Sequence, residues 1–292
     1  MKYAVLAPVA AGVTADPAWI GPWAEHAEAC GFESIVAVEH AAVASRYDSV
    51  YPYAESGKME LADDLDIPDP LDLLAHLAGR TSRIGLATGV LVLPNHHPVV
   101  LAKRLATIDA LSAGRLRIAV GMGWMREEIE ACGADFDTRG RRADEQIAVL
   151  RALWADTAPE GATHDGEFFQ FRNLMSYPKP VQDGIPIHIG GHSKAAARRA
   201  GRLGQGLQPL GVAGDELRAL IKLMREEAER TGRDPDALQL TLGHSLAKVT
   251  PEKAQRLADQ GADRLVLSPV PTGDLDEARD ELSACAERLG LS

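Results

Sequence analysis

The glycine pair Gly190–Gly191 is the clearest signal for a ligand site in the sequence. It follows the β-branched run at 186–189 and precedes a helix pattern that Ser193 can cap, with His192 in the turn between them. Glycine lets a ligand approach the backbone, and a helix N-terminus presents unpaired N–H groups, so this turn could hold a phosphate. A tight strand-to-helix turn without a ligand would show the same pattern. No GxGxxG or Walker GK[ST] motif is present.

Other residues that could do chemistry follow predicted strands. Glu39 and His40 end the second strand, and an imidazole beside a carboxylate can exchange protons near neutral pH. Further residues that follow the predicted strands are Asn95, His96, His97, Gly121, Met122, Gly123, Trp124, Glu127, Glu128, His192, His244 and Ser245. If the strands close into a barrel, all of these residues gather at one rim.

The spacing of these residues disfavours two common kinds of site. HxH and HExxH patterns are absent, so we expect no catalytic metal. A GxSxG motif is also absent, and Ser193 is better explained as a helix cap than as a nucleophile.

The elements that must position these residues alternate between strand and helix along the whole chain. The predicted strands are Tyr3–Ala7, Ser34–Val38, Ile84–Val92, Arg115–Val120, Ile185–Ile189, Leu207–Leu210, Leu238–Leu242 and Arg264–Leu267, and a helix pattern follows each one. Continuous apolar strands separated by amphipathic helices are typical of parallel strands buried on both faces. Eight such units predict a (β/α)₈ barrel that occupies residues 1–292 as one domain. An open, doubly wound sheet with added elements is the alternative.

Two long insertions interrupt the alternation. Residues 41–69 follow the second strand and carry Tyr47, Tyr51 and Tyr53. This insertion leaves the carboxyl end of a strand, the active face of a barrel, so we expect its tyrosines to cover the substrate. Residues 157–183 follow the fourth helix, are rich in phenylalanine and proline, and could form a short hairpin.

A glycine at position 89 lies inside the third predicted strand. Glycine within a strand marks a bulge or the close approach of a ligand or another backbone. In a barrel, Gly89 and Val90 would face the centre near the carboxyl end of the strand, where a flat ring system could press against the backbone.

The net charge of −11 argues against nucleic acid and anionic membrane surfaces as partners. The three cysteines, Cys30, Cys132 and Cys285, are far apart and form no CxxC pair, as is typical of reduced thiols. No run of 18 apolar residues and no signal-peptide pattern is present, so we expect a soluble, cytoplasmic protein.

Several blocks, in this order along the chain, resemble one protein family. They are GFESIVAVEH (31–40), RYDSVYPYAESGK (46–58), TSRIGLATGVLVLPNHHPVVLAKRLATIDALSAGR (81–115), GRLRIAVGMGW (114–124), CGADFDTRGRRADEQIAVLRALW (132–154), YPKPVQ (177–182) and IPIHIGGHSKAAARRAGRLGQG (185–206). Together they resemble the bacterial luciferase-like monooxygenase superfamily. More narrowly, they resemble the actinobacterial branch that uses coenzyme F420, a 5-deazaflavin.

The resemblance implies a (β/α)₈ barrel, a flavin or deazaflavin at its C-terminal mouth, and a homodimer. It places His40 near the reactive ring as an acid–base residue, beside Glu39, which stands where many relatives have aspartate. It also places a non-prolyl cis peptide, a bulge behind the ring, at Gly89–Val90.

The remaining implied contacts concern the cofactor tail. Gly121, Met122 and Gly123 would line it, and residues 190–193 would bind its phosphate. True luciferases have an arginine for the flavin phosphate where Met122 aligns, so the resemblance favours the deazaflavin over FMN.

We therefore expect a coenzyme F420-dependent oxidoreductase that transfers a hydride between C5 of the deazaflavin and a small organic substrate. One alternative is an FMN-dependent monooxygenase that uses molecular oxygen. A second is a flavin-binding protein without catalysis.

Overall fold

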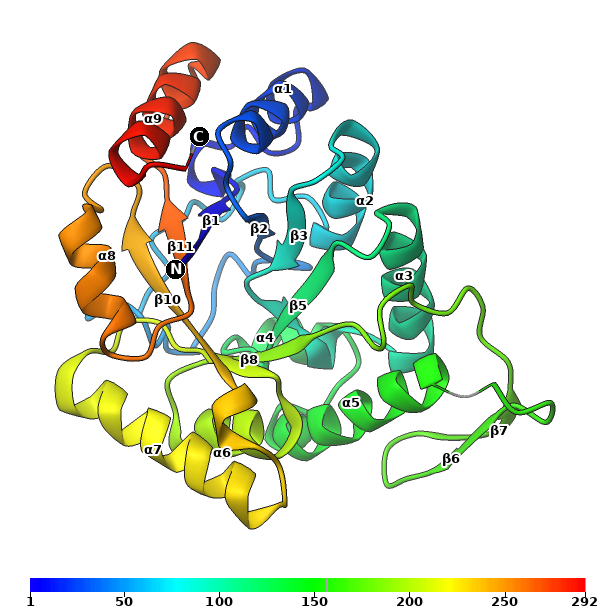
Figure 1. The fold of residues 1–292 in the computed structure, drawn as a ribbon. Coiled ribbons are helices and arrows are strands. Elements are labelled where there is room, and N and C mark those ends of the chain that lie inside the picture. The colour runs from blue at the N-terminus through cyan, green and yellow to red at the C-terminus, as the bar shows by residue number, and fades with distance from the viewer. Residues whose placement is uncertain (156, 292) are drawn as a thin grey trace.

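The computed structural model describes residues 1–155 and 157–291, which form a closed parallel barrel surrounded by helices (Figure 1). The strands are β1 (Lys2–Leu6), β2 (Ser34–Ala37), β3 (Gly85–Thr88), β4 (Leu91–Val92), β5 (Leu116–Gly121), β8 (Ile187–Gly190), β9 (Gly206–Gln208), β10 (Gln239–Ser245) and β11 (Arg264–Ser268). Their order is β3-β2-β1-β11-β10-β9-β8-β5-β4, and pairing between β3 and β5 closes the barrel. The predicted (β/α)₈ barrel is confirmed, because β3 and β4 share the third strand position.

The outer ring consists of α1 (Pro17–Ala29), α2 (Pro70–Arg80), α3 (Pro98–Leu111), α5 (Arg139–Ala155), α6 (Lys194–Leu203), α7 (Gly214–Arg230), α8 (Pro251–Ala258) and α9 (Leu275–Leu289). Local sequence explains where several helices begin. Asp16, Asp69, Ser193, Thr250 and Asp274 each accept a backbone N–H of the first turn. A proline lies in the first turn of α1, α2, α3 and α8, where its missing N–H costs no helical hydrogen bond.

The third predicted strand differs from the expectation, because it is split into β3 and β4. The Gly89–Val90 peptide between them is cis, as the family resemblance implied. A side chain at Gly89 would collide with Cγ1 of Val36 on the neighbouring strand, so the backbone path at this point requires glycine.

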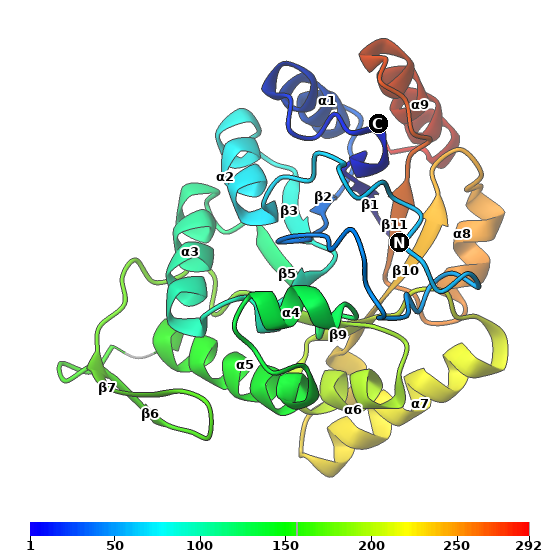
Figure 2. The ribbon, with the colours of Figure 1, turned by 180° about the vertical axis from the view of Figure 1, so that it is seen from behind.

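The first insertion, residues 41–69, contains no regular helix or strand in the described structure. Figure 2 shows this segment, in blue, running across the opening of the barrel. The short helix α4 (Arg126–Ala131) lies beneath it, and Glu127 on α4 accepts hydrogen bonds from the N–H of Asp48 (2.8 Å) and the hydroxyl of Ser49 (2.7 Å). The helix pattern of α4 was too short for sequence periodicity to show.

The second insertion forms the expected hairpin. Strands β6 (Ala162–Asp165) and β7 (Gln170–Leu174) pair antiparallel and project outside the ring of helices, beside α5 (Figure 1). None of the described helices is both long and apolar enough to cross a lipid bilayer.

Candidate active site

A buried carboxylate fixes His40 at the carboxyl end of β2. Nδ1 of His40 lies 3.0 Å from Oε2 of Glu128, the α4 residue that is only 4% exposed. The other oxygen of Glu128 accepts the N–H of Ala41 (2.6 Å) and the side-chain amide of Asn95 (3.2 Å). Within the described part of the chain, Nε2 of His40 has no hydrogen-bond partner. The ring is therefore held at one nitrogen while the other remains available for proton exchange.

Glu39, the neighbour of His40, points to a different partner. Its carboxylate accepts the N–H of Val92 on β4 (2.5 Å) and lies 2.6 Å from Nε2 of His96. The residue is 6% exposed. The structure therefore separates the two residues that the sequence placed together, because Glu39 fixes the broken third strand and His40 pairs with Glu128.

Val90 fits into a notch between two glycines on neighbouring strands. A Cβ on Gly121 of β5 would lie 2.7 Å from Cγ2 of Val90, and a Cβ on Gly190 of β8 would come inside 3.0 Å of Cγ1. At the end of β5, Gly123 has a φ of +77°, and a Cβ there would lie 2.6 Å from Cδ1 of Ile129. These glycines form part of the wall at the mouth of the barrel. Met122, which stands between Gly121 and Gly123, is half-buried.

The Gly-Gly turn leads into the N-terminus of α6 as the sequence indicated. Gly191 has a φ of +106°, a conformation that favours glycine, and its N–H donates to the carbonyl of Gln208 (3.1 Å). Oγ of Ser193 accepts the N–H of Ala196 (3.1 Å), which confirms the predicted cap. Among the described residues, the backbone N–H groups of residues 192–195 have no partner. Together with the helix dipole, these donors are suited to an anion.

Four aromatic side chains, Trp124, Tyr47, Tyr51 and Tyr53, form a row between His40 and the Gly-Gly turn. Ring centroids lie 6.1 Å apart for His40 and Trp124, 5.4 Å for Tyr47 and Trp124, and 5.0 Å for Tyr51 and Trp124. The row continues from Tyr51 to Tyr53 (5.3 Å) and from Tyr53 to His192 (5.2 Å). Burial raises the pKa of Tyr51 and Tyr53, so both phenols stay neutral at physiological pH.

Three buried polar atoms near this row have no partner within the described residues. They are Oδ1 of Asn95, Nδ1 of His192 and Oε1 of Gln208. The amide of Gln208 also faces Gly89 across the barrel, since a Cβ at Gly89 would lie 3.0 Å from Nε2 of Gln208. Buried polar atoms normally have partners, so these three are candidates to contact a polar ligand.

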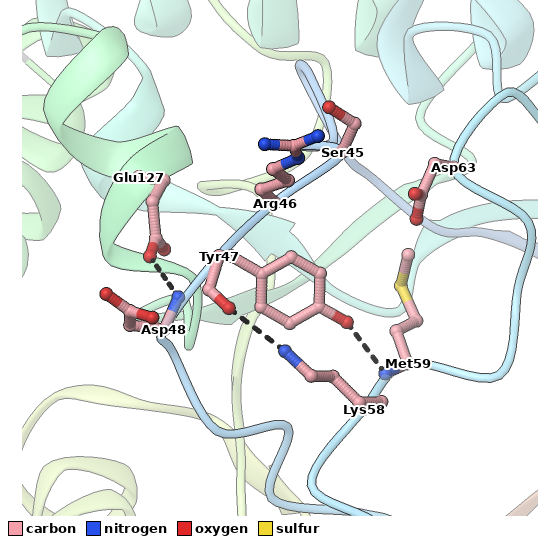
Figure 3. A pocket seen from close by; sticks show the side chains of 8 residues that line it. All are labelled: Ser45, Arg46, Tyr47, Asp48, Lys58, Met59, Asp63 and Glu127. Carbon is pink, nitrogen blue, oxygen red and sulfur yellow. Dashed lines mark hydrogen bonds between the residues drawn. The ribbon is translucent and has the colours of Figure 1, made fainter.

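Tyr47 borders a pocket of about 670 Å³ that residues of the first insertion line together with Glu127 (Figure 3). Nζ of Lys58 donates to the carbonyl of Tyr47 (2.9 Å) and lies 4.0 Å from its ring centroid, while the hydroxyl of Tyr47 accepts the N–H of Met59 (3.1 Å). The pocket is lined by Ser45, Arg46, Tyr47, Asp48, Lys58, Met59, Asp63 and Glu127. Neither His40 nor the Gly-Gly turn lines it, so we place the chemistry outside this pocket.

In the sequence, Glu128 and Asn95 are marked only as members of the predicted rim, and no pattern distinguishes Trp124 or Gln208. The pairing of Glu128 with His40 depends on α4, which periodicity did not reveal. No sequence signal marked Gln208, which ends a three-residue strand. Among the residues that the structure describes, no group of three or more His, Cys, Asp or Glu side chains could hold a metal ion.

The model of the family described as luciferase-like monooxygenase matches residues 1–290. The chain belongs to this family. It is therefore an oxidoreductase built on the barrel shared by luciferase-like proteins, as the resemblance of its sequence blocks implied.

Two relatives in this family are similar over most of the chain. An uncharacterised protein of Mycobacterium tuberculosis is 34% identical over 272 residues, which cover 90% of this chain and 89% of the relative. An F420-dependent glucose-6-phosphate dehydrogenase of Mycolicibacterium fortuitum is 30% identical over 251 residues, covering 74% and 73% of the two chains.

Solved structures share the fold at lower identity. An F420-dependent secondary alcohol dehydrogenase in complex with an F420–acetone adduct has a TM-score of 0.76 at 18% identity, with 99% and 98% of the chains covered. The monooxygenase RslO1 from Streptomyces bottropensis has a TM-score of 0.74 at 21% identity, with the same coverage.

Proposed function

We propose that this member of the luciferase-like family is a coenzyme F420-dependent oxidoreductase acting on a small organic substrate. The F420-dependent relative that covers 74% of the chain supports this choice of cofactor. Bound in the barrel mouth, the deazaflavin supplies the hydride chemistry at its C5 atom. The residues of this chain bind it, exclude water and move the matching proton.

The site offers a fit for each part of such a cofactor. The unpaired N–H groups of residues 192–195, beside Gly190 and Gly191, suit a phosphate. The wall formed by Gly89, Val90, Gly121, Met122 and Gly123 suits a flat ring and its tail, because several of these positions carry no side chain. The unpartnered Gln208 Oε1 and Asn95 Oδ1 supply polar contacts.

His40 is the residue that would hold or accept the proton, at Nε2. The observation that carries this proposal is the contrast between its two nitrogens: Nδ1 is held by the buried carboxylate of Glu128, and Nε2 is unpaired. Glu128 acts as a positioning residue, because its buried carboxylate fixes the orientation of the imidazole. Glu39 acts in the same indirect way, by fixing β4 and His96.

The tyrosines of residues 41–69 would cover the substrate. Tyr47 and Tyr51 both contact Trp124, and Tyr53 contacts His192, so the segment closes the mouth between the proton-exchanging residue and the phosphate turn. An enclosed mouth would limit water at the reacting carbon.

FMN-dependent monooxygenation is the second candidate, because the neighbour RslO1 is a monooxygenase. The two functions differ in their use of oxygen, since deazaflavins react poorly with it. Binding should be measured by titrating the apoprotein with F420 and with FMN, followed by oxygen uptake during turnover. We expect F420 to bind at least about tenfold more tightly, a difference of about 1.4 kcal/mol, with no oxygen uptake. Tighter binding of FMN together with oxygen uptake would reject the F420 proposal.

The role of His40 is tested with His40→Asn against His76→Asn, a substitution of an exposed histidine on α2. We expect His40→Asn to lower kcat by about 10²–10⁴-fold while F420 binding stays within about threefold. His76→Asn should leave both unchanged. If His40→Asn turns over at the wild-type rate, the assigned proton transfer is wrong. If the wild type binds F420 but neither oxidises the alcohols nor reduces the aldehydes of a substrate panel, the protein is a cofactor-binding protein without catalysis.

We further propose that the protein is a homodimer acting in the cytoplasm. The family resemblance supports the dimer, and the free thiols of Cys30, Cys132 and Cys285 are compatible with a reducing compartment. Light scattering on the purified protein tests the dimer; a mass of one chain at micromolar concentration would contradict it.

A further inference from the structure

A second pocket lies at the opposite end of the barrel, where the amino ends of the strands meet. Its volume is about 370 Å³. Lys2 of β1, Arg117 of β5, His188 of β8 and Arg264 of β11 line it, together with Glu33 just before β2. His40 and the Gly-Gly turn do not line this pocket, because they lie at the carboxyl ends of their strands.

One of the two buried guanidinium groups in this pocket is fully compensated. Arg264 is 2% exposed and pairs with Glu33, with Nη2 at 2.7 Å from Oε1 and Nε at 3.0 Å from Oε2. Its Nη1 donates to Oε1 of Gln239 (3.2 Å). The single carboxylate of the pocket is therefore engaged by Arg264.

The other guanidinium, of Arg117, lacks a counter-charge at contact distance. Arg117 is 8% exposed, and its Nη2 donates to the hydroxyl of Ser34 (3.2 Å) but lies 4.0 Å from Glu33. Its Nη1 is buried without any partner in the described structure. A buried charge that keeps an unused donor is costly unless something outside the chain compensates it.

The other side chains that line the pocket add to this excess of positive charge. Four cationic side chains, those of Lys2, Arg115, Arg117 and Arg264, line the pocket against the one carboxylate. Burial and the nearby charge of Arg264 lower the pKa of Arg117 to about 10, so it still carries its charge at neutral pH. His188 is 1% exposed, and its Nδ1 is a second buried polar atom without a partner.

We propose that this pocket binds a small oxyanion of the phosphate or sulfate class. Nη1 of Arg117 is the principal donor, and Lys2, which is exposed at the pocket's edge, adds attraction. The site is separate from the cofactor site and independent of the proposed function.

Calorimetric titration of the full-length protein with inorganic phosphate, at constant ionic strength set with chloride, tests the proposal. We expect saturable binding in the wild type. Arg117→Met should weaken it at least about tenfold and Lys2→Gln about threefold, because charge-assisted hydrogen bonds and nearby charges are lost. Lys222→Gln, which alters an exposed ion pair with Glu226 on α7, is the matched control and should leave binding within about twofold.

Ser193→Ala distinguishes phosphate binding at the two ends of the barrel. It changes the N-terminus of α6 and leaves the pocket around Arg117 intact. The site around Arg117 is supported if the affinity for phosphate is unchanged in Ser193→Ala and falls in Arg117→Met and Lys2→Gln. Binding that falls in Ser193→Ala and persists in the other two variants overturns it, as does the absence of saturable binding in the wild type.

Thermal unfolding gives a second readout, which also covers the case in which Arg117→Met does not fold. Phosphate and sulfate should each raise the Tm of the wild type above its value in chloride, and the rise should be smaller in Lys2→Gln. An equal rise in wild type and Lys2→Gln would contradict the proposal.

Discussion

At the level of single residues, the position of His40 depends on Glu128. Its carboxylate holds the imidazole and also accepts the N–H of Ala41 at the start of the insertion. We predict that Glu128→Gln, which keeps an acceptor but removes the charge, lowers kcat by about 10–10²-fold with F420 affinity within about threefold. Steady-state kinetics and fluorescence titration measure the two quantities separately.

Glu128→Ala is the informative companion, because it removes the charge and the hydrogen bonds together. We expect it to reduce kcat further and to raise KM, since the segment at 41–42 loses its anchor. Equal kcat in Glu128→Gln and wild type would show that the charge has no part in positioning or stabilising His40.

The notch that holds Val90 gives a second prediction for single residues. Gly190→Ala would place a methyl group against Cγ1 of Val90 and lower the free energy of unfolding by about 1–3 kcal/mol. In a Val90→Ala background the same substitution should cost at least about 1 kcal/mol less, because the colliding methyl is gone. Urea unfolding of the double-mutant cycle measures this coupling. Gly79→Ala, at an open helical position on α2, is the control and should not destabilise the protein.

At the scale of elements, Glu28 joins α1 to the start of β3. Its carboxylate accepts the N–H groups of Ser82 (2.9 Å), Arg83 (2.6 Å) and Ile84 (2.8 Å). Burial alone would raise the pKa of Glu28, but these hydrogen bonds lower it to about 2. This stabilisation is therefore complete above the ordinary pKa near 4.5 and is lost as the pH falls toward 2.

We predict that Glu28→Gln lowers the free energy of unfolding at pH 7 by about 1–3 kcal/mol, because an amide is a weaker acceptor for three donors. Glu25→Gln on the same helix removes only an exposed pair with Arg80 and should cost less than about 1 kcal/mol. Urea denaturation of both variants measures the two losses of unfolding free energy. Equal losses would show that the hydrogen bonds of Glu28 stabilise the protein no more than an exposed ion pair does.

At the scale of the whole molecule, His188 links stability to pH through the barrel interior. Burial and, to a smaller extent, the charges of Arg117, Arg264 and Lys2 together lower the pKa of His188 to about 3, against an opposing effect of Glu33. The unfolded chain binds a proton near the ordinary pKa of 6.5, whereas the folded chain does not until about pH 3. The contribution of His188 to stability is therefore complete above pH 6.5 and is lost as the pH drops toward 3.

We predict that His188→Gln reduces the slope of unfolding free energy against pH by about 1.1 kcal/mol per unit on average between pH 6.5 and 5. Urea unfolding in phosphate-free buffer measures the slope, and His76→Gln, at an exposed position on α2, is the control. An unchanged slope in His188→Gln would mean that the buried imidazole takes up its proton at the same pH in the folded chain as in the unfolded chain.

The order of the strands and helices follows from local patterns in the amino-acid sequence. Alternating strand and helix patterns predicted the barrel because each strand is continuously apolar and each helix is amphipathic, and these are local properties. The cap at Ser193 was readable because a cap bonds to a residue two or three positions away. Family blocks further indicated His40, the Gly-Gly turn and the cis peptide at Gly89–Val90.

Which of these residues contact one another depends on the closed barrel. His40 and Glu128 are 88 positions apart, and Glu39 and His96 are 57 apart, so no local pattern could show that the adjacent Glu39 and His40 have different partners. The notch for Val90 and the orphan amide of Gln208 likewise arise from strands brought together around a closed barrel. The same closure gathers Arg117, His188 and Arg264 at the opposite end, because the barrel brings the starts of distant strands into one layer.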